Sequence, residues 1–224
     1  AALEREGGIV EERIVGEQNA SLAVLDPDGT LVGRIGDRPE VVTEPDWPNA
    51  RDAEGNLVPI LAAEIPSRDN GGLSADGKSV TWKLKKGVQW HDGQPFTADD
   101  VVFNWEYHKD PATSSSWIST YRDIKVTKVD SHTVKVDFPK PTPFWAEPFV
   151  GTVGMIIPKH VFAPYIGAKS REAPANTRPV GTGPYKIVDF KPGDLVRAEI
   201  NNSYHIANRP HFDTFEMKGG GDAT

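Results

Sequence analysis

The sequence predicts a mixed α/β protein built from short strands, a few helical stretches and many turns. Glycine and proline are abundant, with 21 and 19 among 224 residues, which is more than a helical bundle tolerates and is typical of strands joined by loops. Several stretches alternate apolar and polar residues, the pattern of half-buried strands, and one stretch carries a clear helix start. Hydrophobic residues make up 38% of the chain, enough for a globular core.

The first fifty residues carry the weakest pattern. Residues 9–14 fit the beginning of either a strand or a short helix. Residues 21–32 are predicted to form a hairpin, because two apolar runs flank D-P-D-G at 26–29, a strong turn sequence. The charged, proline-rich stretch 37–49 is expected to be a loop.

The middle of the chain predicts a strand followed by a capped helix. Residues 80–84 alternate apolar and polar side chains, as a half-buried strand does. Thr97 and Asp100 have the spacing of a capping box, in which the threonine hydroxyl accepts from an early helical N–H. The helix is therefore expected over residues 98–108, and the Asp-Pro pair at 110–111 ends it.

Three short stretches between residues 144 and 165 are less regular. Residues 144–149 are compatible with a short helix, and 155–158 with a buried strand end. Residues 159–165 fit a helical turn.

Hairpins account for most of the remaining pattern. Residues 124–129 and 133–138 are predicted to pair around a three-residue turn. Residues 185–190 and 195–200 are predicted to pair around the turn K-P-G-D at 191–194, with a further strand at 212–217.

Composition excludes several classes of function. The net charge of −7 argues against nucleic acid as a partner, because a phosphate-binding surface needs an excess of Lys and Arg. The absence of cysteine excludes disulfides, a thiol nucleophile and a cysteine-based zinc site. No run reaches the about 18 apolar residues of a membrane span, and the first residues lack the pattern of a signal peptide. The six histidines show no H-E-x-x-H spacing, so no metal and no cofactor is expected.

Three motifs resemble one family. Residues 80–105 read V-T-W-K-L-K-K-G-V-Q-W-H-D-G-Q-P-F-T-A-D-D-V-V-F-N-W, which resembles the signature of the family 5 extracellular solute-binding proteins, the peptide-, nickel- and opine-binding group. P-V-G-T-G-P-Y at 179–185 resembles the family's G-T-G-P-Y loop. N-N-S-Y at 201–204 resembles its N-P-x-Y run, with Asn202 where proline is usual, and 218–224 resembles the lead into the second lobe.

The resemblance covers about residues 53–224 and implies a fold like that of type II periplasmic binding proteins. Residues 51–160 would form the small α/β subdomain of lobe I, and 161–224 an incomplete ligand-binding lobe that ends at the hinge glycines 219–221. Residues 1–50 depart from the family, whose opening strand is not found there. The chain is therefore interpreted as an N-terminal fragment, expected to bind ligand poorly without its second lobe.

The family also implies a function without chemistry. Its members capture peptides or opine-like amino-acid conjugates and deliver them to the permease subunits of an ABC importer. The expected location is the periplasm or the cell exterior, with a lipoprotein anchor on the full-length form and a monomeric state. Roomy, hydrated pockets for ligand side chains would give broad specificity.

Four residues are predicted ligand contacts. In similar peptide-binding members an aromatic residue at the position of Trp117 faces the cleft, and Tyr121 follows one helical turn later; packing within the subdomain is the alternative. Trp145, with its neighbour Phe149, fits either the cleft or the core. Gly183 lies in a loop that is either a tight structural turn or a backbone that approaches the ligand closely.

Two other functions stay open. A nickel- or metal-chelate binder of the same family is one. The other, from a different class, is a hydrolase built around His91 or the Asp99/Asp100 pair. Adjacent residues on an extended segment point to opposite faces, so His91 and Asp92 cannot form a relay with each other. No nucleophile, base and orienting group can be assembled by spacing, so binding is favoured over catalysis.

Overall fold

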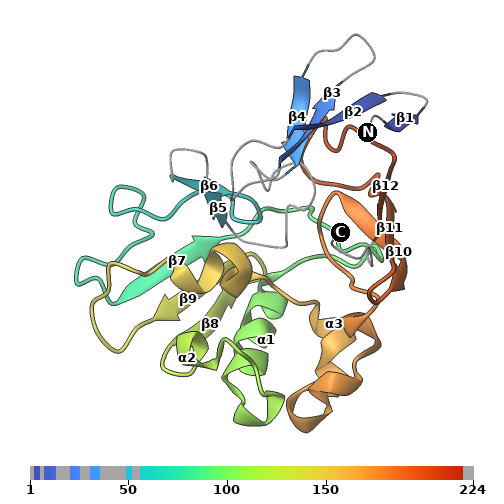
Figure 1. Ribbon diagram of the computed structural model, residues 1–224. Helices are drawn as coiled ribbons and strands as arrows, with labels where there is room; N and C mark the ends of the chain where they lie inside the picture. Colours follow the sequence, from blue (N-terminus) through green and yellow to red (C-terminus); the bar gives the residue numbers. More distant parts are fainter. Residues whose placement is uncertain are drawn as a thin grey trace. The chain divides into compact units, whose positions relative to one another are not determined.

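The computed structural model describes residues 3–5, 8–13, 21–25, 31–35, 49–51 and 56–218 (Figure 1). The chain divides into two compact units, Ala1–Glu44 and Pro45–Thr224. The predicted turn at 26–29, most of the predicted loop at 37–49 and the predicted hinge glycines at 219–221 lie outside the described residues. The predicted boundaries at residues 50 and 160 stay predictions.

The first unit contains an antiparallel sheet with its strands in sequence order. Strands β1 (Leu3–Arg5), β2 (Gly8–Arg13), β3 (Ser21–Leu25) and β4 (Leu31–Ile35) pair with their neighbours in turn. The β3–β4 pair confirms the two arms of the predicted hairpin. β2 settles the choice left open for residues 9–14 in favour of a strand.

The second unit contains two three-stranded sheets and a short two-stranded one. Its strands are β5 (Asn49–Arg51), β6 (Leu57–Pro59), β7 (Ser79–Lys83), β8 (Lys125–Asp130), β9 (Thr133–Asp137), β10 (Tyr185–Lys191), β11 (Leu195–Ile200) and β12 (Thr214–Lys218). Its α-helices are α1 (Ala98–Lys109), α2 (Ile118–Tyr121) and α3 (Lys159–Phe162). Short 3-10 helices lie at Pro111–Thr113, Glu147–Phe149, Gly151–Gly154, Ala163–Tyr165, Gly167–Glu172 and Pro174–Asn176.

The first of these sheets, in the order β7-β9-β8, carries the main core. Val80 and Trp82 of β7 face inward with exposures of 0% and 1%, as the alternating sequence predicts. They pair with Val136 and Val134 of β9, both fully buried. Helix α1 packs against β8 and β9. We call the buried residues gathered here the Trp82 core; besides those named, they include Leu61, Trp90, Phe96, Val101, Tyr121, Phe149 and Ile156.

The predicted capping box forms at the start of α1. Thr97 Oγ1 accepts a hydrogen bond from Asp99 N–H at 3.3 Å, and Asp100 Oδ2 accepts one from Thr97 N–H at 2.9 Å. The other carboxylate oxygen of Asp100 accepts from Lys159 N–H at 3.0 Å. One buried carboxylate therefore joins the starts of α1 and α3, and burial raises its pKa, although these hydrogen bonds oppose the shift.

The short helix expected within 144–149 is present as a 3-10 helix, Glu147–Phe149. The predicted strand at 155–158 is wrong, because this described segment pairs with no strand. Its Ile157 N–H donates instead to the Asn104 side chain at 3.3 Å, and the following Pro158 has no N–H to give a ladder.

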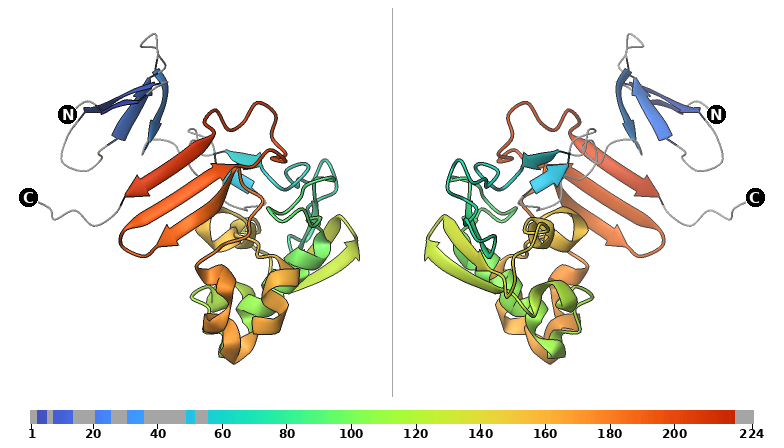
Figure 2. Two further views of the ribbon diagram at one scale, coloured as in Figure 1. Left: turned by 90° about the vertical axis from the view of Figure 1, so that its right-hand side faces the viewer. Right: turned by 90° about the vertical axis from the view of Figure 1, so that its left-hand side faces the viewer.

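Strands β10, β11 and β12 form one antiparallel sheet (Figure 2). The register of its strands gives it two contrasting faces. Residues directly opposite each other in the register share a face. One face is apolar throughout and is called here the apolar sheet face; it comprises Tyr185, Ile187, Phe190, Val196, Ala198, Ile200, Phe215 and Met217. The other is charged and includes the Arg197–Glu216 ion pair at 2.8 Å. The predicted hairpin around 191–194 is confirmed.

Candidate functional site

Trp117 lies at the start of α2, where it is the N-cap residue. Its side chain is half-buried and packs against the Trp82 core. Its backbone N–H donates to Ser115 Oγ at 3.1 Å. Trp117 is thus partly exposed while packed on the core, a placement that fits both ligand contact and packing within the subdomain.

Tyr121 lies in the Trp82 core and has no exposed surface. Its hydroxyl donates to the Pro148 carbonyl at 2.6 Å and accepts from Asn104 Nδ2 at 3.4 Å. Burial raises the pKa of this hydroxyl. Tyr121 follows Trp117 by one helical turn, as predicted, but its side chain points into the core. A ligand cannot reach it there, and we propose no ligand contact for this residue.

Trp145 and Phe149 pack around Trp82. The Trp145 ring is tilted against Trp82 with centroids 5.6 Å apart, and Phe149 meets the same ring edge-on at 5.9 Å. Phe149 is 1% exposed and Trp145 half-buried. Both positions agree with the core alternative that the sequence left open.

The loop that contains Gly183 is held by residues from the two other motifs. His91 N–H donates to the Gly181 carbonyl at 2.7 Å, and Gly181 N–H returns a hydrogen bond to His91 Nδ1 at 3.1 Å. His91 Nε2 and Asn201 Nδ2 both donate to the Gly183 carbonyl, at 3.0 and 2.9 Å. The three motifs that looked separate in the sequence therefore meet at one carbonyl oxygen, and the Gly183 loop is a built structural junction.

These contacts fix the state of His91. A backbone N–H can only donate and a carbonyl can only accept, so Nδ1 is bare and Nε2 carries the proton. Burial lowers the pKa of His91, a shift that the Gly183 hydrogen bond opposes. Both ring nitrogens are occupied, Asp99 pairs with Lys128 at 2.6 Å, and Asp100 caps α1. The residues on which the hydrolase alternative depends, His91, Asp99 and Asp100, are thus all engaged in structural contacts.

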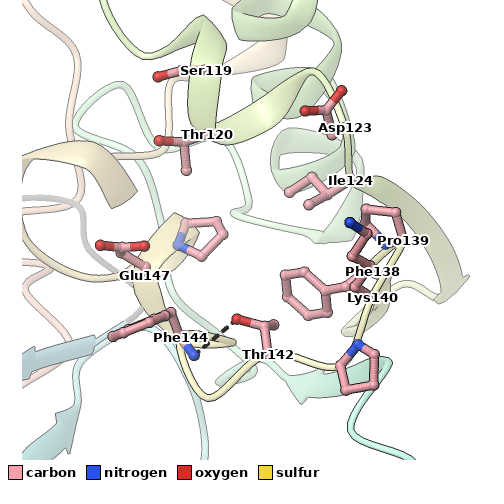
Figure 3. A pocket seen from close by; sticks show the side chains of 12 residues that line it. Ser119, Thr120, Asp123, Ile124, Phe138, Pro139, Lys140, Thr142, Phe144 and Glu147 are labelled. Carbon is pink, nitrogen blue, oxygen red and sulfur yellow. Dashed lines mark hydrogen bonds between the residues drawn. The ribbon is translucent and has the colours of Figure 1, made fainter.

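A groove of about 440 Å³ opens between α2 and the proline-rich segment that follows β9 (Figure 3). Ser119, Thr120 and Asp123 line one wall, and Phe138 and Phe144 lie across from them. Phe144 is 68% exposed, the most of any large apolar residue among those described. Ser119 and Thr120 line this groove, but Trp117 and Tyr121, which flank them in the sequence, do not.

Within the described part of the chain, no three histidine or acidic side chains come together as metal ligands would. The helices described there are also too short or too polar to cross a bilayer.

Comparison with known proteins identifies a family for most of the chain. The model for bacterial extracellular solute-binding proteins, family 5 Middle, matches residues 56–224. The oligopeptide-binding protein AppA of Bacillus subtilis is 34% identical over 171 residues, which are 75% of this chain and 30% of AppA.

Solved structures of binding proteins share the fold. AppA of Bacillus subtilis in complex with a nonapeptide matches with a TM-score of 0.69 at 28% identity, over 78% of this chain and 34% of that chain. MoaA of A. tumefaciens R10 with mannopinic acid gives 0.65 at 28% identity, over 77% and 34%. NikZ of Campylobacter jejuni with Ni(L-His) gives 0.68 at 28% identity, over 78% and 33%. The chain therefore spans about a third of the length of these proteins.

Proposed function

Because this chain belongs to the bacterial extracellular solute-binding proteins of family 5, we propose that its protein captures peptides or opine-like amino-acid conjugates and delivers them to the permease of an ABC importer. The predicted family and mixed α/β fold class are confirmed, and the structural neighbours are type II periplasmic binding proteins. The observation that carries the proposal is the family match over residues 56–224.

Trp117 is the ligand contact that we propose on this chain. It follows three serines, is half-buried, and rests on the Trp82 core. A large aromatic side chain that is held by packing and still partly exposed can bind a ligand with little loss of side-chain freedom. No ligand contact is proposed for Gly183 or Trp145, because the first lies in a loop held by Asn201 and His91 and the second packs on Trp82.

The protein would act by binding alone, in the periplasm or outside the cell, as a monomer and with a lipid anchor on its full-length form. No reaction is proposed, because the candidate base His91 has both ring nitrogens in backbone hydrogen bonds. A base must reach the proton that it abstracts, and a nitrogen already paired in a tight junction does not.

A nickel- or metal-chelate ligand is the second candidate, and the similarity to NikZ in complex with Ni(L-His) favours it. In a metal chelate the small molecule already supplies donor atoms to the metal, so the protein needs to supply fewer metal ligands. Equilibrium dialysis with nickel and free histidine separates this candidate from peptide binding.

The test uses the full-length protein, because this chain alone is expected to bind ligand poorly. A mixed peptide pool, two opines and Ni–histidine are each titrated against it, and binding is followed by thermal shift and calorimetry. We expect stabilisation by peptides or opines, and Trp117→Ala should weaken that binding by about tenfold, since truncating an aromatic contact residue commonly costs more than about 1 kcal/mol. Val129→Ala is the control, since it removes a 60% exposed apolar side chain that does not line the groove and should leave affinity unchanged. Stabilisation only by Ni–histidine, or by a sugar added as a further arm, contradicts the peptide and opine assignment.

A further inference from the structure

The segment that leads to Trp117 has little regular structure to hold it. After α1 ends, a 3-10 turn at Pro111–Thr113 gives way to Ser114, whose φ of 55° places it in the left-handed region. Helix α2 is only four residues long, and no side-chain hydrogen bond caps its start. The Trp117 side chain packs on the Trp82 core, and its backbone is held by a contact from the residues just before it.

Ser115 contacts both Trp117 and helix α1. Its Oγ accepts the Trp117 N–H at 3.1 Å and is also in hydrogen-bonding contact with His108 Nδ1. His108 belongs to the last turn of α1, and burial lowers its pKa to about 4, so the ring is neutral at pH 7. With a neutral ring whose proton is on Nε2, the Ser115 hydroxyl donates to Nδ1 while accepting from Trp117.

His108 is itself fixed against the Trp82 core. Its ring stacks on Tyr121 with centroids 5.0 Å apart and an interplanar angle of 15°. Tyr107 packs against it edge-on at 5.6 Å. Tyr121 is anchored in turn by its hydroxyl on the Pro148 carbonyl. A continuous line of contacts thus runs from the buried core through His108 and Ser115 to the backbone of Trp117.

We propose that His108 and Ser115 are positioning residues that hold Trp117 in its ligand-ready orientation. The value of this arrangement for binding rests on the proposed function of Trp117. An aromatic that is already ordered loses less conformational freedom when ligand arrives, which corresponds to roughly two- to tenfold in affinity for one side chain. His108 and Ser115 touch no ligand in this scheme and act only through Trp117.

The first experiment needs no ligand. The protein is labelled with 5-fluorotryptophan, and the 19F resonance of Trp117 is identified by its absence in Trp117→Phe. In Ser115→Ala and in His108→Asn we expect this resonance to shift and change width, while Ser115→Thr, which keeps the hydroxyl, restores the wild-type signal. An unchanged Trp117 resonance in Ser115→Ala overturns the proposal.

The chain offers a matched control of the same chemistry. Ser131 Oγ lies 2.9 Å from His132 Nδ1 on the exposed turn between β8 and β9. Ser131→Ala removes a serine–histidine contact that leads to no tryptophan, so it should leave the Trp117 resonance unchanged. If His108→Asn fails to fold, Ser115→Ala alone decides, because Ser115 lies in a half-buried loop outside the core.

A binding experiment separates this inference from the proposed function. In the full-length protein, Ser115→Ala should weaken binding of the peptide pool two- to tenfold, and the same change made in Trp117→Ala should weaken it no further. If Trp117→Ala leaves affinity intact, the ligand role of Trp117 falls while the fluorine result still decides the positioning. If Ser115→Ala weakens binding equally with and without Trp117, the two serine contacts act elsewhere and the proposal is overturned.

Discussion

The Trp82 core and the apolar sheet face are built from the same kinds of residues but are closed to different degrees. Trp82, Val80 and Val134 have exposures of 0% to 1%. On the apolar sheet face only Ala198 is buried to that extent, while Phe190 and Met217 remain 39% and 54% exposed. In both regions the alternating sequence pattern correctly predicts which face of the sheet is apolar. The pattern does not predict how much of that face is buried by other segments.

The covering segment explains part of this difference. The Trp82 core is enclosed by α1, the loop at 88–96 and the segment at 145–156. The apolar sheet face is approached by residues 176–179, which leave a hollow of about 180 Å³ against Ile187, Phe190 and Val196. Stability should therefore reside mainly in the first region, and substitutions in the two regions should differ in cost.

The largest effect is expected at Trp82. Trp82→Ala removes the ring on which Trp145 and Phe149 pack and leaves a cavity, at a cost of about 3–5 kcal/mol in the free energy of unfolding. Urea unfolding followed by circular dichroism measures this loss. A cost below about 1 kcal/mol would mean that the Trp82 core does not dominate the stability of this unit.

A smaller effect is expected at the junction between the two regions. His91→Ala leaves the buried Gly181 N–H without its acceptor and removes one of two donors to the Gly183 carbonyl. An unsatisfied buried amide costs about 1–3 kcal/mol. The exposed His211, just before β12, provides the control His211→Ala, which should cost little. Amide exchange at Gly181 should accelerate in His91→Ala only, and equal protection in both variants would contradict the junction.

Acid should weaken the packing on the Trp82 core through His108, whose ring stacks on Tyr121. His108 has a folded pKa of about 4 and an ordinary pKa of 6.5, so the unfolded chain binds more protons between these values. The contribution of neutral His108 is complete above pH 6.5 and is lost as the pH falls toward 4. At pH 5 the loss is about 2 kcal/mol.

The same direction holds for His91 and His205, whose pKa values burial also lowers. Unfolding free energies measured at pH 7 and pH 5 test the prediction. His108→Asn should lose about 2 kcal/mol less than the wild type over this interval. An identical loss in both proteins would show that His108 does not titrate as its burial requires.

Local signals in the sequence predicted the elements that depend on neighbouring residues. The capping box of Thr97 and Asp100 placed the start of α1, and the turn at 191–194 placed the β10–β11 pair. The segment at 155–158 was predicted wrongly, because an apolar run before a proline has the same pattern in a strand and in a buried loop. Its partner is the side chain of Asn104, 53 positions away, and no local pattern reveals that.

The candidate site was predictable only in part for a related reason. Trp117 was predicted from the resemblance to peptide-binding members of the family, and it does lie half-buried at the start of α2. Tyr121 was predicted because it follows Trp117 by one helical turn. Its side chain lies in the core instead, where its hydroxyl donates to the carbonyl of the distant Pro148. His108 and Ser115 gave no signal in the sequence. They lie seven positions apart, and their contact depends on the fold of the loop between them, which contains the left-handed Ser114.

The smallest effect is expected on the apolar sheet face. Met217→Ser, at a side chain that is 54% exposed, should change the unfolding free energy by less than about 0.5 kcal/mol. It should also reduce the binding of a dye such as ANS, which reports exposed apolar surface, because Met217 lies opposite Val196 on that face. Lys218→Ser on the charged face is the matched control and should leave dye binding unchanged. If Met217→Ser instead costs as much as a core substitution, the face is buried in solution, and sedimentation at two protein concentrations would show whether association buries it.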